Sequence, residues 1–68
     1  MSFTQWLQRQ RHRNDPIGDI ARDAGQDETW PKRQRTFGAF YAYLEECGAC
    51  DGALRALRAA WAEWRRAS

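Results

Sequence analysis

The sequence contains no long apolar run. No apolar stretch among its 68 residues approaches the roughly 20 residues that a helix needs to cross a bilayer. The N-terminal segment lacks the apolar core of a signal peptide. We therefore expect a cytoplasmic protein with no membrane association. A chain of this length is typically one small domain, so we expect a single domain over residues 1–68.

Residues that carry catalysis are also scarce. His12 is the only histidine, so no His-based triad or dyad can be assembled. The glycines are isolated and form no glycine-rich phosphate loop. One histidine and two cysteines fall short of the four ligands of a structural zinc site. We expect no enzymatic activity, no cofactor, no bound metal and no small-molecule substrate.

The two cysteines, Cys47 and Cys50, have the C-x-x-C spacing of thiol redox enzymes and of half a zinc site. A thioredoxin-type site places its reactive cysteine at a helix N-terminus, which stabilises the thiolate. Cys47 instead ends a predicted helix, next to Glu45 and Glu46, whereas Cys50 precedes the next helix and is the better candidate for a reactive thiol. We interpret the pair as a corner between helices, and keep thiol redox or metal binding as an alternative.

Two helices are predicted in the N-terminal half. The first spans about residues 2–10 and begins with an S-x-x-Q capping box. The second begins after Asp15, a good N-cap residue, with Pro16 at the first helical position. The loop that follows contains Trp30, which the next proline pushes toward an extended conformation. We expect the Trp30 side chain to reach the core from this loop.

Two more helices are predicted in the C-terminal half. The third runs from about Thr36, its N-cap, to Cys47, and Gly48 suits the left-handed position after its end. The fourth starts at Asp51, another N-cap, and continues to about Arg66. Its apolar seam consists of Leu54, Leu57, Trp61 and Trp64. No segment alternates like a strand, so the predicted class is all-α, a compact bundle of four short helices.

The net charge is only +2, but the basic residues are clustered. The two clusters lie in or beside loops and consist of Arg9, Arg11, Arg13, Lys32, Arg33 and Arg35. Arg55 and Arg58 add a pair on the fourth helix. If these residues converge in space, they form a surface for nucleic-acid phosphates with little base readout. Our leading hypothesis is therefore a non-enzymatic interaction module that binds nucleic acid through these clusters. The alternative is that the clusters pair with acidic residues of the same chain.

Acidic residues recur every four positions along the second helix and therefore line one edge of it. The residues proposed to contact a protein partner are Asp19, Asp23 and Asp27. This edge would dock on a basic surface of another protein, or of a second copy joined head to tail. A continuous basic patch would favour nucleic acid, whereas opposed acidic and basic faces would favour protein association.

Read from end to end, the chain resembles the YozE-like family of small bacterial proteins, which have a SAM-like (sterile alpha motif-like) fold. The resemblance rests on SFTQWL at the start, DPIGDIARDAGQDETWPK through the second helix and its loop, YLE at residues 43–45, and AWAEW near the end. Its most specific part is the series Asp27, Trp30 and Pro31. The resemblance implies a four-helix SAM-like bundle with a long C-terminal helix, no enzyme activity, and binding of proteins, other copies of the fold or nucleic acid. It does not call for cysteine at positions 47 and 50.

Overall fold

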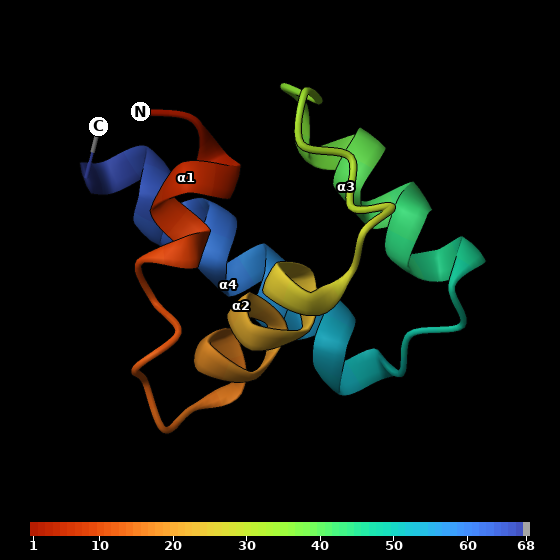
Figure 1. Cartoon of the computed structure of the whole chain (residues 1–68), viewed down its shortest axis with the longest axis horizontal. Coiled ribbons are helices and arrows are strands. Elements are labelled where there is room, and N and C mark those ends of the chain that lie inside the picture. The colour runs from red at the N-terminus through yellow and green to blue at the C-terminus, as the bar shows by residue number, and fades with distance from the viewer. Residues whose placement is uncertain (68) are drawn as a thin grey trace.

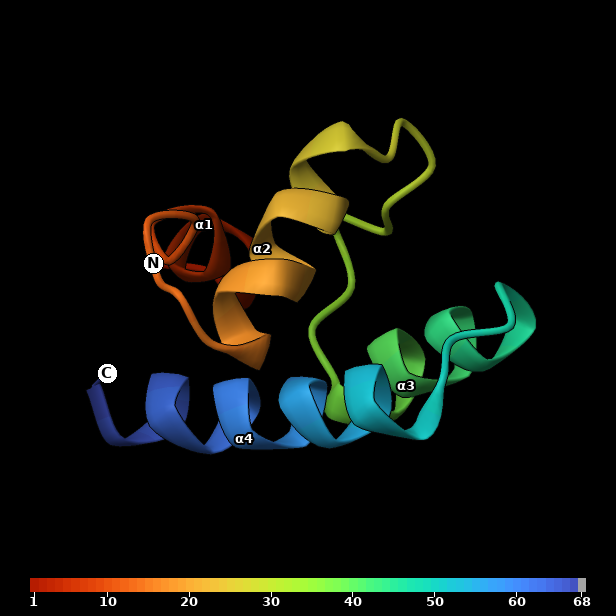
Figure 2. The same ribbon diagram turned by 90° about the horizontal axis from the view of Figure 1, so that it is seen from below.

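The computed structural model describes residues 1–67 and consists of four helices joined by loops (Figure 1). The helices are α1 (Phe3–Gln8), α2 (Pro16–Gln26), α3 (Phe37–Glu46) and α4 (Asp51–Ala67). α4 is the longest, with 17 residues, and lies along one edge of the molecule (Figure 2). α1 and α2 lie on one side of α4, and α3 packs beside its N-terminal half. The all-α class and the four-helix bundle are confirmed, and no strand occurs over residues 1–67.

Side-chain caps set the starts of the first three helices. The hydroxyl of Ser2 accepts the N–H of Gln5 at 3.1 Å, and the Gln5 side chain accepts the N–H of Ser2 at 3.0 Å, which completes the capping box. Asp15 accepts the N–H of Gly18 at 2.9 Å, and Thr36 caps α3 in the same way. These three predicted caps are confirmed. α1 is shorter than predicted, because its last helical residue is Gln8.

The predicted cap of α4 is off by one residue. The helix begins at Asp51 itself, and the carbonyl of Cys50 accepts the first intrahelical bond, from the N–H of Leu54 at 3.1 Å. Cys50 therefore occupies the N-cap position. Asp51 lies in the first turn, where its negative charge is stabilised by the positive end of the helix dipole.

The corner between α3 and α4 is built by a Schellman motif. Gly48 has φ 77°, in the left-handed region that favours glycine. Its N–H donates to the carbonyl of Glu45, and the N–H of Ala49 donates to the carbonyl of Leu44, both at 3.0 Å. The predicted role of Gly48 is confirmed. The chain leaves α3 and enters α4 through four residues that hold both cysteines.

Aromatic and aliphatic side chains from all four helices form the core. Phe40 is fully buried, and its ring packs 5.2 Å from Phe3 and 5.4 Å from Trp30, measured between centroids. Trp30 is buried from the α2–α3 loop, as predicted, and its indole N–H donates to the hydroxyl of Thr4 at 3.0 Å. This bond satisfies the polar atom of the buried ring and fixes the loop against α1.

Small residues let α2 and α4 approach closely. The buried alanines of these helices are Ala21, Ala24, Ala56 and Ala60. The predicted seam of α4 is only partly buried, because Leu57 is enclosed while Trp61 and Trp64 remain half-buried. α4 therefore turns a narrow face of alanines and Leu57 toward the core. None of the helices described over residues 1–67 is both long and apolar enough to span a membrane.

Candidate nucleic-acid interface

Arg13, from the first predicted basic cluster, is used inside the chain. Its guanidinium makes two bonds to the carboxylate of Glu63 on α4, at 2.9 and 3.2 Å, and a third contact to Asp15 at 2.8 Å. The hydrogen bonds that Arg13 donates to Glu63, and secondarily to Asp15, raise the pKa of Arg13 above its ordinary value. The same bond from Arg13 lowers the pKa of Glu63. Arg13 therefore links the α1–α2 loop to α4 and is not available to a phosphate.

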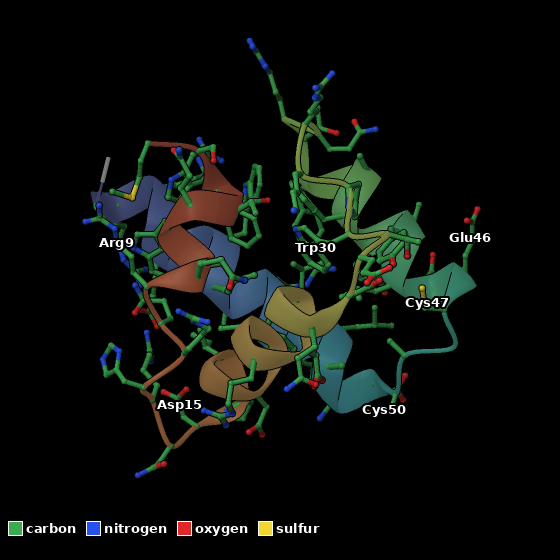
Figure 3. The ribbon with its side chains drawn as sticks, in the orientation of Figure 1. Arg9, Asp15, Trp30, Glu46, Cys47 and Cys50 are labelled. Carbon is green, nitrogen blue, oxygen red and sulfur yellow. The ribbon has the colours of Figure 1, made fainter. Side chains whose placement is uncertain are left out.

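The remaining cations of the two clusters do not share one surface. Arg11 donates to the backbone carbonyl of Gln8 at 3.1 Å, and Arg9 is exposed at the end of α1 (Figure 3). The second cluster is exposed on the loop after α2 and contains Lys32, Arg33 and Arg35. Figures 1 and 2 show the two loops on different sides of α2. The two clusters therefore lie on separate loops.

A third group of cations covers the outer face of α4. Every exposed residue of this helix after Gly52 is arginine or alanine. These residues are Arg55, Arg58, Ala59, Ala62, Arg65, Arg66 and Ala67. The only acid among residues 55–67 is Glu63, which is half-buried and bound to Arg13. We call this surface the arginine face of α4.

The arginine face could have been found from the sequence. Residues 55, 58, 62 and 65 are spaced by three, four and three, which places them in one stripe on a helix. The sequence analysis singled out the pair Arg55 and Arg58, but did not extend the stripe to Arg65. The apolar seam beside it instead led to an interpretation of α4 as a core-packing helix.

A hollow of about 320 Å³ opens between α3 and α4 beside the arginine face. Its lining residues are Phe37, Arg58, Trp61, Ala62 and Arg65. The guanidinium carbon of Arg58 lies 5.3 Å from the centroid of the Phe37 ring and 5.9 Å from that of Tyr41. These distances are those of cation–π contacts. The hollow therefore combines half-buried aromatic rings with positive charge at its rim.

Two of the three acids predicted to contact a partner are used within the fold. Asp19 forms an ion pair with Arg22 at 2.5 Å, one turn along α2. Asp27 accepts a hydrogen bond from the hydroxyl of Tyr43, and accepts both the N–H and the hydroxyl of Thr29, at 2.9 and 2.8 Å. Asp23 is exposed, and no side-chain hydrogen bond or ion pair of Asp23 is found among residues 1–67.

The bond between Asp27 and Tyr43 joins the end of α2 to α3. Because the Tyr43 hydroxyl and Thr29 donate to it, the carboxylate of Asp27 has a pKa below its ordinary value. The carboxylate in turn raises the pKa of Tyr43 to about 12. No sequence pattern pointed to this pairing, because the two residues are 16 positions apart. Through these bonds Asp27 holds the loop that carries Trp30 against α3.

Cys47 and Cys50 are exposed free thiols on either side of the α3–α4 corner (Figure 3). Within the part of the chain that the structure describes, no three His, Cys, Asp or Glu side chains gather as a metal site would require. We interpret both cysteines as parts of the corner, Cys47 as the C-cap of α3 and Cys50 as the N-cap of α4.

Comparison with known protein families shows where this architecture belongs. The family model described as YozE SAM-like fold matches residues 2–66, nearly the whole chain. Comparison with curated proteins and with solved structures gave no match. The match covers all four helices and the loop that carries Trp30, so it agrees with the resemblance noted in the sequence.

Proposed function

The chain belongs to the YozE SAM-like fold family, and from this premise we propose that it is a small interaction module that binds nucleic-acid phosphates through the arginine face of α4. The observation that carries the proposal is that arginine and alanine are the only exposed residues of α4 after Gly52. The surface differs from the one first expected, because Arg13 is bound to Glu63 and the two loop clusters lie apart.

The spacing of the cations suits a polyanion. Arg55 and Arg66 are separated by about 16 Å along the helix axis at 1.5 Å per residue. A nucleic-acid backbone presents closely spaced negative charges over such a length, and each neutralised phosphate releases counterions. Guanidinium groups bind phosphate through two parallel hydrogen bonds. The exposed alanines between the arginines are small, so the backbone can approach the helix closely.

Binding to a fluorescently labelled thymidine oligonucleotide of about 12 nucleotides, a length within the usual site sizes for single strands, tests the proposal. We expect binding at low salt that weakens as salt rises. The slope of the logarithm of the association constant against the logarithm of the salt concentration should be about −0.7 for each phosphate contact. The double variant Arg55→Gln/Arg66→Gln should bind more weakly and show a shallower salt dependence.

The matched control is Arg9→Gln/Arg11→Gln, which removes the same charge from a surface outside α4. It should retain the affinity and the salt dependence of the wild type. The proposal is wrong if the oligonucleotide does not bind at low salt, if its affinity ignores salt, or if the control variant loses as much affinity as the α4 variant.

A second candidate function is association with another copy of the chain. The observation that favours it is a hollow of about 330 Å³ between α2 and the start of α4, where Asp19 and Asp23 border the apolar side chains of Ile20 and Ala53. Such an acidic edge complements the arginine face, so copies could join head to tail. Sedimentation at rising concentration should then show oligomers that Asp23→Asn dissociates. A monomer at every concentration would remove this candidate.

A further inference from the structure

The hollow between α3 and α4 has the composition of a stacking site. Phe37 and Trp61 are half-buried, so part of each ring remains open to solvent. Their centroids lie 6.0 Å apart with the ring planes at 60°, so the two rings present differently oriented surfaces. Ala62 leaves space on the helix side, and Arg58 and Arg65 complete the lining.

Resting on the proposed function, we propose that this hollow receives an unpaired nucleobase, so that the ligand of the arginine face is single-stranded nucleic acid. Unstacked bases bind on aromatic rings and on guanidinium planes. Arg58 supplies such a plane, because its guanidinium lies over Phe37 and Tyr41 and its side chain is exposed. The hollow is at the lower end of the volume range of ligand pockets.

Cations stand on both sides of the hollow along the helix. Arg58 and Arg65 are seven residues apart, which is about 10 Å along the axis. A base that enters between them leaves its neighbouring phosphates close to these two side chains. The basic loop that contains Arg35 leads directly into α3 and reaches Phe37 two residues later. The aromatic surface of the hollow is therefore bordered by Arg58 and Arg65, and the basic loop joins it at Phe37.

A duplex does not fit this site equally well. Its bases are paired and stacked, and placing one of them in the hollow would require the base to be unstacked and unpaired first. The phosphates of a duplex would still be attracted to the arginine face. We therefore expect both forms to bind, with the single strand binding more tightly when charge and length are matched.

The decisive comparison uses an abasic oligonucleotide with the same length and the same number of phosphates as the thymidine oligonucleotide. One stacked base should make the thymidine oligonucleotide bind about 5- to 150-fold more tightly. The wild-type protein, a labelled probe and fluorescence anisotropy at low salt suffice for this measurement.

A matched pair of variants locates the base. Ala62→Leu places a larger side chain in the hollow without changing the charge, whereas Ala59→Leu adds the same side chain to an exposed position that does not line it. Leucine is nearly as good a helix former as alanine, so both variants should fold. Ala62→Leu should lose the preference for thymidine over abasic backbone and keep its affinity for the abasic probe; Ala59→Leu should keep the preference.

The outcomes separate this inference from the proposed function. Equal binding of the thymidine and abasic probes would overturn the stacking site and leave phosphate binding intact. Failure of both probes to bind at low salt would overturn both proposals. Polyglutamate of matched charge that binds as tightly as the thymidine probe would also overturn the inference, because the surface would then fit an acidic protein.

Discussion

The charged residues of α2 and those of α4 are used in different ways. At the ends of α2, Asp15 accepts the N–H of Gly18 in the first turn, and Asp27 accepts bonds from Thr29 in the following loop and from Tyr43 on α3. On α4, Arg55 and Arg66 are exposed. The comparison shows that charged residues close together in the sequence can be paired within the fold or left exposed, depending on which groups lie across from them.

The difference follows from the position of the two helices. α2 is short, and loops join it at both ends, so the carboxylates at its ends meet the N–H groups and side chains of those loops. α4 lies along an edge of the molecule and turns only its narrow alanine face toward α2 (Figure 2). Arg55 and Arg66 are therefore exposed to solvent, where a phosphate can replace water and counterions at low cost.

Substitution of Gly18 is the most severe test of the α2 side. A Cβ at this position would lie 2.1 Å from the backbone carbonyl oxygen of Arg13, and the backbone cannot move away without breaking the Asp15 cap. We expect Gly18→Ala to lower the free energy of unfolding by about 3 kcal/mol, the upper end of the range for overpacking. Urea denaturation measures the change. A neutral variant would show that the contact between α2 and the preceding loop is loose.

Replacing one arginine in each region tests the comparison directly. Arg13→Gln removes a bidentate bond to Glu63 from a partly buried site, and we expect it to lower the free energy of unfolding by about 1 kcal/mol, discounted for partial exposure. Arg55→Gln should change stability by less than about 0.5 kcal/mol. Urea denaturation measures both changes. Equal losses in the free energy of unfolding would contradict the comparison.

The bond between Asp27 and Tyr43 should make stability depend on pH at both extremes. The pKa of Asp27 is lowered from 3.8, so its contribution is present above that pH and is lost as the pH falls through the folded-state pKa. The pKa of Tyr43 is raised from 10.0 to about 12, so its contribution is present below pH 10 and is lost as the pH rises toward 12. The change in stability at either pH extreme should be smaller than that caused by Arg13→Gln, because Asp27 and Tyr43 both lie near solvent.

The variant Tyr43→Phe checks this dependence. It removes the hydroxyl, so it should abolish the alkaline loss of stability and weaken the acid loss. The free energy of unfolding, measured with urea across the pH range, gives both limbs. An alkaline loss of unchanged size in Tyr43→Phe would show that another group is responsible.

Gly52 is the counterpart of Gly18, and its substitution should have a small effect of the opposite sign. A Cβ at Gly52 would meet only the sulfur of Cys50, at 3.8 Å, which is ordinary contact. We expect Gly52→Ala to raise the free energy of unfolding by about 0.5 kcal/mol, because alanine is the better helix former. Thermal denaturation checks it, and a destabilised variant would show that the first turn of α4 is more constrained than its open surroundings indicate.

Features that depend on neighbouring residues could be predicted from the sequence. The Asp15 cap, the Thr36 cap and the left-handed Gly48 each involve partners within a few positions. The burial of Trp30 followed from the proline after it and from the size of its ring. These interactions form over such short distances in the chain that their residues specify them almost regardless of the fold.

The candidate site depended on distant contacts and could be predicted only in part. The pairing of Arg13 with Glu63 joins residues 50 positions apart, and nothing in either segment indicates the other. The positions of the two basic loops likewise depend on how the helices pack, which no short stretch of sequence specifies. Charge clusters in the sequence therefore predicted a binding surface on the loops, whereas the surface that we propose lies on α4.

The most direct test of the central claim is a map of backbone amide chemical shifts during titration with the thymidine oligonucleotide. The account predicts shifts along the exposed side of α4 and at the start of α3, around Phe37 and Ala62, with α2 nearly unchanged. Shifts concentrated on α2 or on the α1–α2 loop, with α4 unaffected, would contradict it.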